Sequence, residues 1–310
     1  MALTPAASAA PAVREVILDT DVGDDIDDAF ALALLLASPE LHVDGIMASF
    51  GDTHLRARLA ERFLRATGRT DIAVGAGPST PPATRFTQRA WAYAQAGATI
   101  PDAVTASLDQ LRTTPPGRIT LIALAPLTTI GAMIDRDPKT FRRLAGVVLM
   151  GGSIHRGYGQ HAGETSPHPS DEYNVRCDPA GLRKLLASGV AVTLMPLDAT
   201  EIALDATRRT RLFAAGTPST DVLQALYAQW VTGNPWGTTP TLFDVVPVAW
   251  LLRPSVCEPV PLRIEVGDGG TTRVVAGAPN ASVCLDVDKT AVLDLLDARL
   301  RPRPRARIAG

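Results

Sequence analysis

A run of aspartates between an expected strand and an expected helix constrains this chain most tightly. Six carboxylates lie within ten residues, at Asp19, Asp21, Asp24, Asp25, Asp27 and Asp28. Residues 13–18 before them form a short run rich in β-branched residues that predicts a buried strand, and the apolar residues 29–37 predict a buried helix. The acids therefore belong to a turn at the carboxyl end of a strand, where open α/β sheets bind their ligands.

Six acids this close cannot all stay ionised in a semi-buried turn without a cation or several hydrogen bonds. Because Ca²⁺ and Mg²⁺ prefer oxygen ligands, a hard divalent metal is the economical interpretation. Helix capping is the alternative, since acids are favoured at the N-cap and in the first turn. Capping would account for one or two acids, and we expect one of the six to cap the helix. It does not account for Asp19 and Asp21 on the strand side, so a metal site is favoured.

The remaining chain alternates short apolar strands with helices, which indicates parallel βαβ units. Further buried strands are expected at residues 43–50, 72–75, 118–124, 146–150 and 190–195. Further helices are expected at residues 53–67, 129–135, 178–187, 217–232, 240–252 and 288–300. Alternating segments at residues 260–266 and 272–276 predict an antiparallel hairpin. We predict an α/β fold with a mostly parallel, Rossmann-like central sheet flanked by helices, plus a small antiparallel extension near the C-terminus.

One domain is expected at residues 13–300, between a disordered N-terminal extension at residues 1–12 and a flexible basic tail at residues 301–310. Within this domain, residues 76–116 show only a weak pattern, with a short helix around Trp91 and Tyr93. A long polar connection of this kind is either a lid or binding loop, or an ordinary surface excursion. The sequence leaves both interpretations open.

Composition excludes some partners. The net charge of −2 over 310 residues gives no electrostatic reason to expect nucleic acid or an anionic membrane as a partner, and no run of 18 apolar residues predicts a membrane span. The cysteines, Cys177, Cys257 and Cys284, are widely spaced and odd in number. We therefore expect no disulfide framework and a reducing, cytoplasmic location.

Polar residues, or segments whose backbone can approach a ligand, recur where the expected strands end. They are Asp19 and Asp21 after the first strand, Asp52 after the second, and the segments that begin at Leu124 and Met150. Because the carboxyl ends of parallel strands share one edge of a sheet, these residues predict a ligand site at that edge.

The order of the motifs identifies a family resemblance. The motifs are, in chain order, Asp19-Thr20-Asp21-Val22-Gly23, Asp27-Asp28-Ala29-Phe30-Ala31-Leu32, Gly51-Asp52, Leu124-Ala125-Pro126-Leu127-Thr128, Glu172-Tyr173-Asn174, Pro196-Leu197-Asp198-Ala199-Thr200 and Asp244-Val245-Val246-Pro247. Together they resemble the nucleoside hydrolase family, the inosine/uridine-preferring ribohydrolases, over about residues 16–254.

The resemblance implies Ca²⁺-dependent hydrolysis of the N-glycosidic bond of a nucleoside, or of a related N-riboside, to ribose and free base. Metal ligands would be Asp21, Asp28, Asp244 and the backbone carbonyl of Leu124, and Asp27 would be the general base that takes a proton from a metal-bound water. The residues implied to line the ribose are Asp52, Met150, Glu172 and Asn174, and those expected at the base are Trp91, Trp236 and Phe243. A homodimer or homotetramer is implied.

Two departures from the family pattern leave choices open. Compared with the commonest spacing in the family, this chain has two extra residues between Gly23 and Asp27. If the family motif is aligned on Gly23, Asp24 and Asp25 take the places of the base and the metal ligand. A match anchored on the helix is preferred, because a bidentate ligand needs a fixed place at the helix start, and it selects Asp27 and Asp28. Phe243 stands where many members carry a histidine that helps to protonate the leaving base. Stacking on aromatic rings, another acid or a better leaving group must then activate that base.

Two other functions remain as alternatives. One is a metal-dependent ribose- or nucleoside-binding protein without turnover, to which the missing histidine points. The other is a Mg²⁺ phosphohydrolase with Asp19 as nucleophile, which would need a lysine against the phosphate. Lys139, Lys184 and Lys289 are poorly placed for that role, so this alternative is the weaker one.

Overall fold

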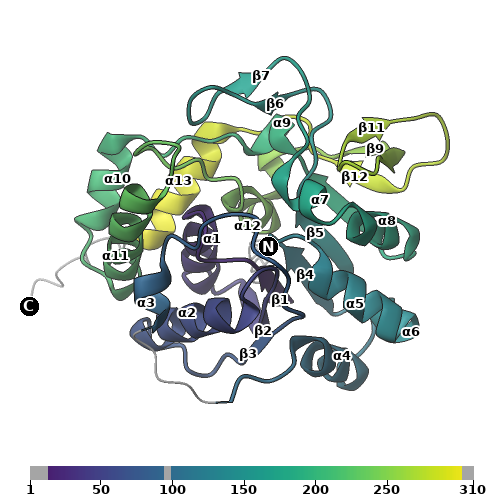
Figure 1. Cartoon of the computed structure of the whole chain (residues 1–310), viewed down its shortest axis with the longest axis horizontal. Helices are drawn as coiled ribbons and strands as arrows, with labels where there is room; N and C mark the ends of the chain where they lie inside the picture. The colour runs from purple at the N-terminus through teal and green to yellow at the C-terminus, as the bar shows by residue number, and fades with distance from the viewer. Residues whose placement is uncertain (1–12, 94–98, 302–310) are drawn as a thin grey trace, which may run out of the picture.

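An eight-stranded sheet forms the centre of the computed structural model, which describes residues 13–93 and 99–301 (Figure 1). Its strands are β1 (Arg14–Thr20), β2 (Leu41–Ala48), β3 (Val74–Ala76), β4 (Ile119–Ala123), β5 (Gly146–Met150), β8 (Val192–Met195), β9 (Val260–Leu262) and β12 (Ala281–Val283). The strand order is β3-β2-β1-β4-β5-β8-β12-β9, and only the β12–β9 pair is antiparallel. The predicted α/β fold with a mostly parallel sheet is confirmed.

Helices cover both faces of this sheet, because alternate side chains of each strand point to opposite faces. In β1, Val16 and Leu18 enter one hydrophobic core and Ile17 enters the other. The first core is covered by α1 (Asp27–Leu36), α2 (Thr53–Ala66), α10 (Ala206–Phe213), α11 (Pro218–Gly233), α12 (Val245–Leu252) and α13 (Lys289–Leu300). The second core is covered by α4 (Ala103–Thr113), α5 (Thr128–Arg136), α6 (Pro138–Phe141) and α8 (Pro179–Ala187), on the other side of the sheet in Figure 1.

Short elements lie around this frame. They are α3 (Arg89–Tyr93), α7 (Tyr173–Cys177), α9 (Leu197–Thr200), the 3₁₀ turn η1 (Pro254–Val256), and the strand pairs β6 (Gly157–Tyr158) with β7 (Thr165–Ser166) and β10 (Ile264–Val266) with β11 (Thr272–Val274). The β10–β11 pair is antiparallel and confirms the predicted C-terminal hairpin. The β6–β7 pair is also antiparallel and forms a second, shorter hairpin.

The chain changes its winding direction between β1 and β4. It runs outward from β1 through β2 to β3 and then returns to place β4 on the other side of β1. Asp19 of β1 pairs with Ala123 of β4, and the Leu124 amide donates to the Asp19 carbonyl at 2.9 Å. A switch point of this kind leaves a crevice at the carboxyl ends of the two strands, so the acidic turn after β1 and Leu124 after β4 both border it.

Three expectations are corrected. Residues 103–113 are not part of a long connection but form α4, which Asp102 caps by accepting the Thr105 amide at 2.7 Å. Cys257 and Cys284 form a disulfide, because the antiparallel β9–β12 pairing brings them together. No acid caps α1, since Ile26 occupies its N-cap and makes no side-chain bond there.

The predicted N-terminal extension lies outside the described residues, and so does the predicted tail except for Arg301. Among residues 13–93 and 99–301, no helix is both long and apolar enough to cross a membrane.

Candidate active site

A cavity of about 640 Å³ opens beside the carboxyl ends of β1, β4 and β5. It is lined by ten of the residues expected at the site, namely Asp21, Asp27, Asp28, Leu124, Met150, Glu172, Asn174, Trp236, Phe243 and Asp244. These residues come from both halves of the chain, and the fold brings them together at the carboxyl edge of the sheet.

Three buried carboxylates gather on one side of this cavity. Asp27, Asp28 and Asp244 each offer an oxygen within 4.8 Å of the others. Asp27 and Asp28 form the first turn of α1, and Asp244 directly precedes α12, which packs against α1. The Asp244 amide donates to Asp27 Oδ2 at 3.3 Å, and the Thr20 hydroxyl donates to Asp28 Oδ1. The pair that the helix-anchored match selects, Asp27 and Asp28, thus lies together with Asp244.

The negative charges of these buried carboxylates are only partly offset by neighbouring groups. Burial raises the pKa of Asp27, Asp28 and Asp244 well above the usual range, and repulsion between neighbouring carboxylates raises it further. Burial likewise raises the pKa of Asp21, which lines the same cavity but is not one of the three gathered acids. Arg56 is the cation that opposes these shifts, at Asp21 and Asp28. A site with this excess of buried negative charge is suited to a divalent cation.

Backbone oxygen completes the donor set. Leu124 lines the cavity, and its carbonyl accepts the Asn174 side-chain amide at 2.8 Å. A carbonyl has two lone pairs, so one hydrogen bond leaves it able to contact a cation. Asp28, Asp244, the nearby Asp21 and this carbonyl, with Asp27 beside them, offer an all-oxygen set of the type that Ca²⁺ takes. The residues present therefore fit the metal that the sequence predicts.

A second group of polar residues holds α7 against the strand ends. The Glu172 carboxylate caps α7 by accepting the Asn174 amide at 2.8 Å and the Val175 amide at 3.0 Å, and it also accepts the Gly152 amide at 3.0 Å. The Asn174 side-chain amide reaches back to the Met150 carbonyl at 3.3 Å. These bonds fix Glu172 and Asn174 on one wall of the cavity.

Aromatic rings, two of them exposed, also line the cavity and form its rim. Trp236 is 60% exposed, and the Tyr158 and Phe243 rings meet edge to face with their centroids 6.0 Å apart. The Tyr158 hydroxyl accepts the Tyr173 amide at 3.0 Å. Trp230, from α11, also lines the cavity although it is nearly fully buried. The cavity thus has an acidic floor and an aromatic mouth.

Two expected site residues lie elsewhere. Asp52 is exposed and caps α2 by accepting the Leu55 amide at 3.1 Å. Trp91 lies under the Arg62 guanidinium, 3.9 Å from its ring centroid. Asp19 lies behind the floor, where Ser49 donates to its Oδ1, and burial raises its pKa to about 7. Neither Asp52 nor Trp91 lines the cavity.

Several lining residues were not expected at the site. They are Thr84, Tyr158, His161, Arg176, Glu201 and Trp230. Trp230 falls on the apolar side of a predicted helix, where a core tryptophan and a cavity tryptophan look alike. Tyr158 reaches the cavity through the β6–β7 hairpin, which has no periodic signal in the sequence.

Fold and site together define a class: α/β proteins that bind a small ligand at the switch point of a parallel sheet, beside buried carboxylates. A family model described as inosine-uridine preferring nucleoside hydrolase matches residues 16–294. The chain therefore belongs to this family and is a ribonucleoside hydrolase, an enzyme that cleaves N-glycosyl bonds.

Individual proteins that are similar to this chain are also named as nucleoside hydrolases. The pyrimidine-specific ribonucleoside hydrolase RihA of Citrobacter koseri is 30% identical over 316 residues, which cover 92% of this chain and 97% of that protein. The structure of a purine-preferring ribonucleoside hydrolase from Gardnerella vaginalis superposes with a TM-score of 0.78 at 21% identity, covering 93% of this chain and 98% of that one. A plant nucleoside hydrolase superposes with a TM-score of 0.77 at 24% identity, covering 94% and 99%. The two structures establish likeness of fold.

Proposed function

We propose that this protein hydrolyses the N-glycosidic bond of ribonucleosides in a Ca²⁺-dependent reaction that releases ribose and the free base. The observation that carries the proposal is the gathering of Asp27, Asp28 and Asp244 within 4.8 Å on the floor of a ligand-sized cavity. A binding protein without turnover would gain nothing from a further carboxylate beside the cation ligands.

Asp21, Asp28, Asp244 and the Leu124 carbonyl would hold the calcium ion. When bound, the ion supplies a positive charge that lowers the pKa of water and attracts ribose hydroxyls. The chain would arrange these ligands through the fixed start of α1, the residue before α12 and the end of β4.

Asp27 would accept the proton of the attacking water. General-base catalysis requires a carboxylate within hydrogen-bond reach of that water, and Asp27 lines the cavity beside the proposed ligands. Cleavage passes through an oxocarbenium-like state, and the buried carboxylates favour that developing positive charge. Met150, Glu172 and Asn174 would line the ribose from the α7 side.

The base would lie toward the aromatic rim. Phe243 and Trp236 line the mouth of the cavity and offer stacking faces, and Tyr158 adds a hydroxyl. Asp52 and Trp91, which were expected in the site, do not line this cavity, so no role in binding is proposed for them. A relative at 30% identity is named as pyrimidine-specific, so uridine and cytidine head the substrates to test, followed by inosine.

The test is ribose release from a nucleoside panel, measured as reducing sugar with added Ca²⁺ and after chelation. We expect ribose from at least one of uridine, cytidine and inosine, and its loss on chelation. A tight nucleoside complex that stays intact for hours would support the binding protein instead. Phosphate release from small esters would support the phosphohydrolase.

Assembly and location remain predictions. We propose a homodimer or homotetramer, which light scattering of the purified chain would test against a monomer of 32.7 kDa. The proposed cytoplasmic location loses its original support, since disulfides are rare in that compartment and Cys257–Cys284 is one. Free-thiol counting on chain isolated under non-reducing conditions tests it: three thiols support a reducing compartment, and one contradicts it.

A further inference from the structure

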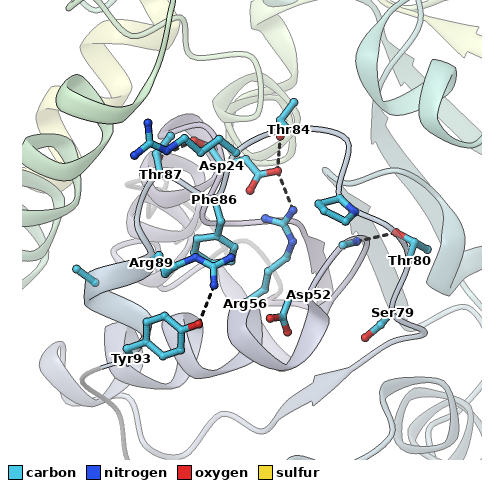
Figure 2. A pocket seen from close by; sticks show the side chains of 14 residues that line it. Asp24, Asp52, Arg56, Ser79, Thr80, Thr84, Phe86, Thr87, Arg89 and Tyr93 are labelled. Atoms are coloured by element: carbon cyan, nitrogen blue, oxygen red, sulfur yellow. Dashed lines mark hydrogen bonds and ion pairs between the residues drawn. The ribbon is translucent and has the colours of Figure 1, made fainter.

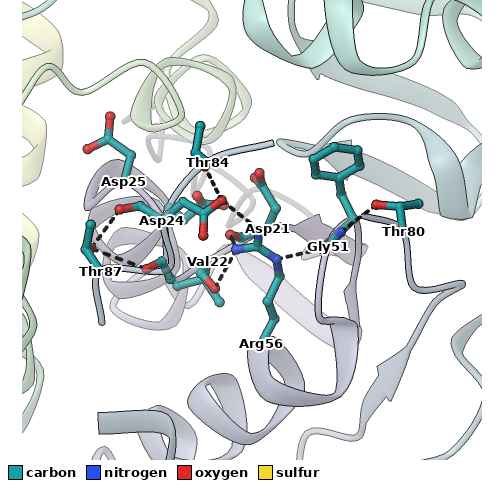
Figure 3. Close-up of polar contacts among 12 residues, drawn as sticks. Asp21, Val22, Asp24, Asp25, Gly51, Arg56, Thr80, Thr84 and Thr87 are labelled. Atoms are coloured by element: carbon teal, nitrogen blue, oxygen red, sulfur yellow. Dashed lines mark hydrogen bonds and ion pairs between the residues drawn. The ribbon is translucent and has the colours of Figure 1, made fainter. Parts of the chain in front are cut away.

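A buried arginine lies directly under the acidic turn. Arg56 of α2 is 2% exposed, and its guanidinium meets four acceptors (Figure 3). Nε donates to the Phe50 carbonyl at 2.7 Å, and Nη1 donates to the Asp21 carbonyl and to the Val22 carbonyl at 3.3 Å. Nη2 donates to Asp24 Oδ2 at 2.9 Å.

This pattern fixes the main chain at a proposed metal ligand. The planar fork of an arginine can serve several acceptors at once in a rigid geometry, whereas a lysine offers a single point charge. Arg56 thereby ties the backbone of Asp21 and Val22 to the end of β2 at Phe50. The orientation of the Asp21 carboxylate depends on that backbone.

The same arginine also introduces a difficulty for cation binding. Its positive charge acts on Asp21 and Asp28, where it favours the ionised carboxylates but would also repel a bound cation. An uncompensated guanidinium this close would weaken the binding of calcium. Asp24 is the carboxylate that pairs with it, in an ion pair that is buried at both ends.

Asp24 itself is held firmly by residues 84–88. The Thr84 hydroxyl donates to Asp24 Oδ2 at 2.5 Å, and the Thr87 hydroxyl donates to the Asp24 carbonyl at 2.7 Å. The Phe86 ring lies over the Arg56 guanidinium at 5.2 Å and presses on Gly23, where a Cβ atom would come within 2.3 Å of the ring. Figure 2 shows these side chains around a second cavity of about 1010 Å³, which shares Asp24 and Thr84 with the first.

We propose that Asp24 is a positioning residue whose carboxylate neutralises Arg56, so that Arg56 can fix the backbone of Asp21 without weakening cation binding. The inference rests on the proposed calcium site. It gives a role to an acid of the two-residue insertion, which pairs with Arg56 and is not one of the three gathered carboxylates. The segment of residues 84–88, whose purpose the sequence left open, serves to hold this pair together.

The test is calcium binding to the metal-stripped full chain by titration calorimetry, with thermal unfolding of each variant. Asp24→Asn keeps the size and an acceptor but removes the charge, and we expect calcium binding to weaken roughly 10- to 100-fold. Asp24→Glu restores the charge and should recover most of the affinity. Glu40→Gln is the matched control, because it breaks a different arginine–carboxylate pair, with Arg299, and should leave calcium affinity unchanged.

Each result decides the inference. Wild-type affinity in Asp24→Asn would overturn it, and so would an Asp24→Glu variant as weak as Asp24→Asn, because charge would then not be the cause. Failure of the wild-type chain to bind calcium would overturn both this inference and the metal site, whereas normal wild-type binding with unaffected variants overturns the inference alone.

Discussion

The floor and the rim of the active-site cavity are built in different ways. The floor consists of carboxylates at the start of α1 and just before α12, held by buried hydrogen bonds. The rim consists of rings such as Tyr158 and Trp236, which come from a two-stranded hairpin and an irregular loop. In the floor every carboxylate is buried, while Trp236 at the rim is 60% exposed.

This difference assigns separate tasks to the two regions. Regular elements fix side chains precisely, which suits cation binding and proton transfer. Loops tolerate substitution and can adapt to different bases. Substitutions in the floor should therefore abolish the chemistry, and those in the rim should change substrate affinity.

The largest effect is expected at Asp27. Asp27→Asn keeps the side-chain volume but removes the proton acceptor, so kcat for ribose release should fall roughly 10²- to 10⁴-fold. Calorimetry should find calcium affinity close to that of the wild type, because Asp28 and Asp244 remain. Full activity of this variant would show that Asp27 is not the base.

Asp244→Asn should weaken calcium binding by about 100-fold or more, since a carboxylate ligand is lost. The same change should raise the thermal midpoint of the metal-free protein, because burial and repulsion from Asp27 and Asp28 make the Asp244 charge unfavourable there. Opposite changes in calcium affinity and apo stability would mark Asp244 as a metal ligand. A lower thermal midpoint in the absence of calcium would contradict this assignment.

Glu201 lines the cavity but is not a proposed metal ligand, so it tests the effect of burial on stability alone. Burial raises the pKa of its carboxyl from 4.5 to about 7. The native state therefore binds more protons than the unfolded state between these values, and the free energy of unfolding should fall as the pH rises through this window. Relative to Glu201→Gln, the wild type should lose about 1–3 kcal/mol between pH 4.5 and 8, measured by urea unfolding.

Glu258→Gln is the control, since Glu258 is exposed. Its unfolding free energy should follow the wild-type pH dependence. A wild-type curve parallel to that of Glu201→Gln across the whole range would refute the assigned pKa shift.

The smallest effect is expected at the rim. Trp236→Ala removes an exposed stacking face, so KM should rise several-fold, while kcat stays within about twofold. The thermal midpoint should not change. Tyr93→Ala removes another exposed ring, at 59% exposure, next to the second cavity and should leave KM unchanged. A large fall in kcat for Trp236→Ala would mean that the rim takes part in the chemistry.

The same contrast explains what the sequence could predict. The strands before Asp21 and Leu124 contain short apolar runs, at residues 16–18 and 121–123, so both residues could be placed at the carboxyl edge of the sheet. Asp52 follows a strand in the same way, yet its side chain turns to cap α2, and strand position alone does not give that direction. The disulfide and the reach of Tyr158 depend on pairings between distant or very short segments, for which the chain has no local pattern.

The central claim is that the buried carboxylates hold a calcium ion needed for the reaction. It is tested most directly by measuring bound calcium per chain and ribose release on the same samples, before chelation, after it, and after calcium is restored. The account predicts one calcium per chain, with bound calcium and ribose release lost together and recovered together. Undiminished ribose release from protein that holds no calcium would contradict it.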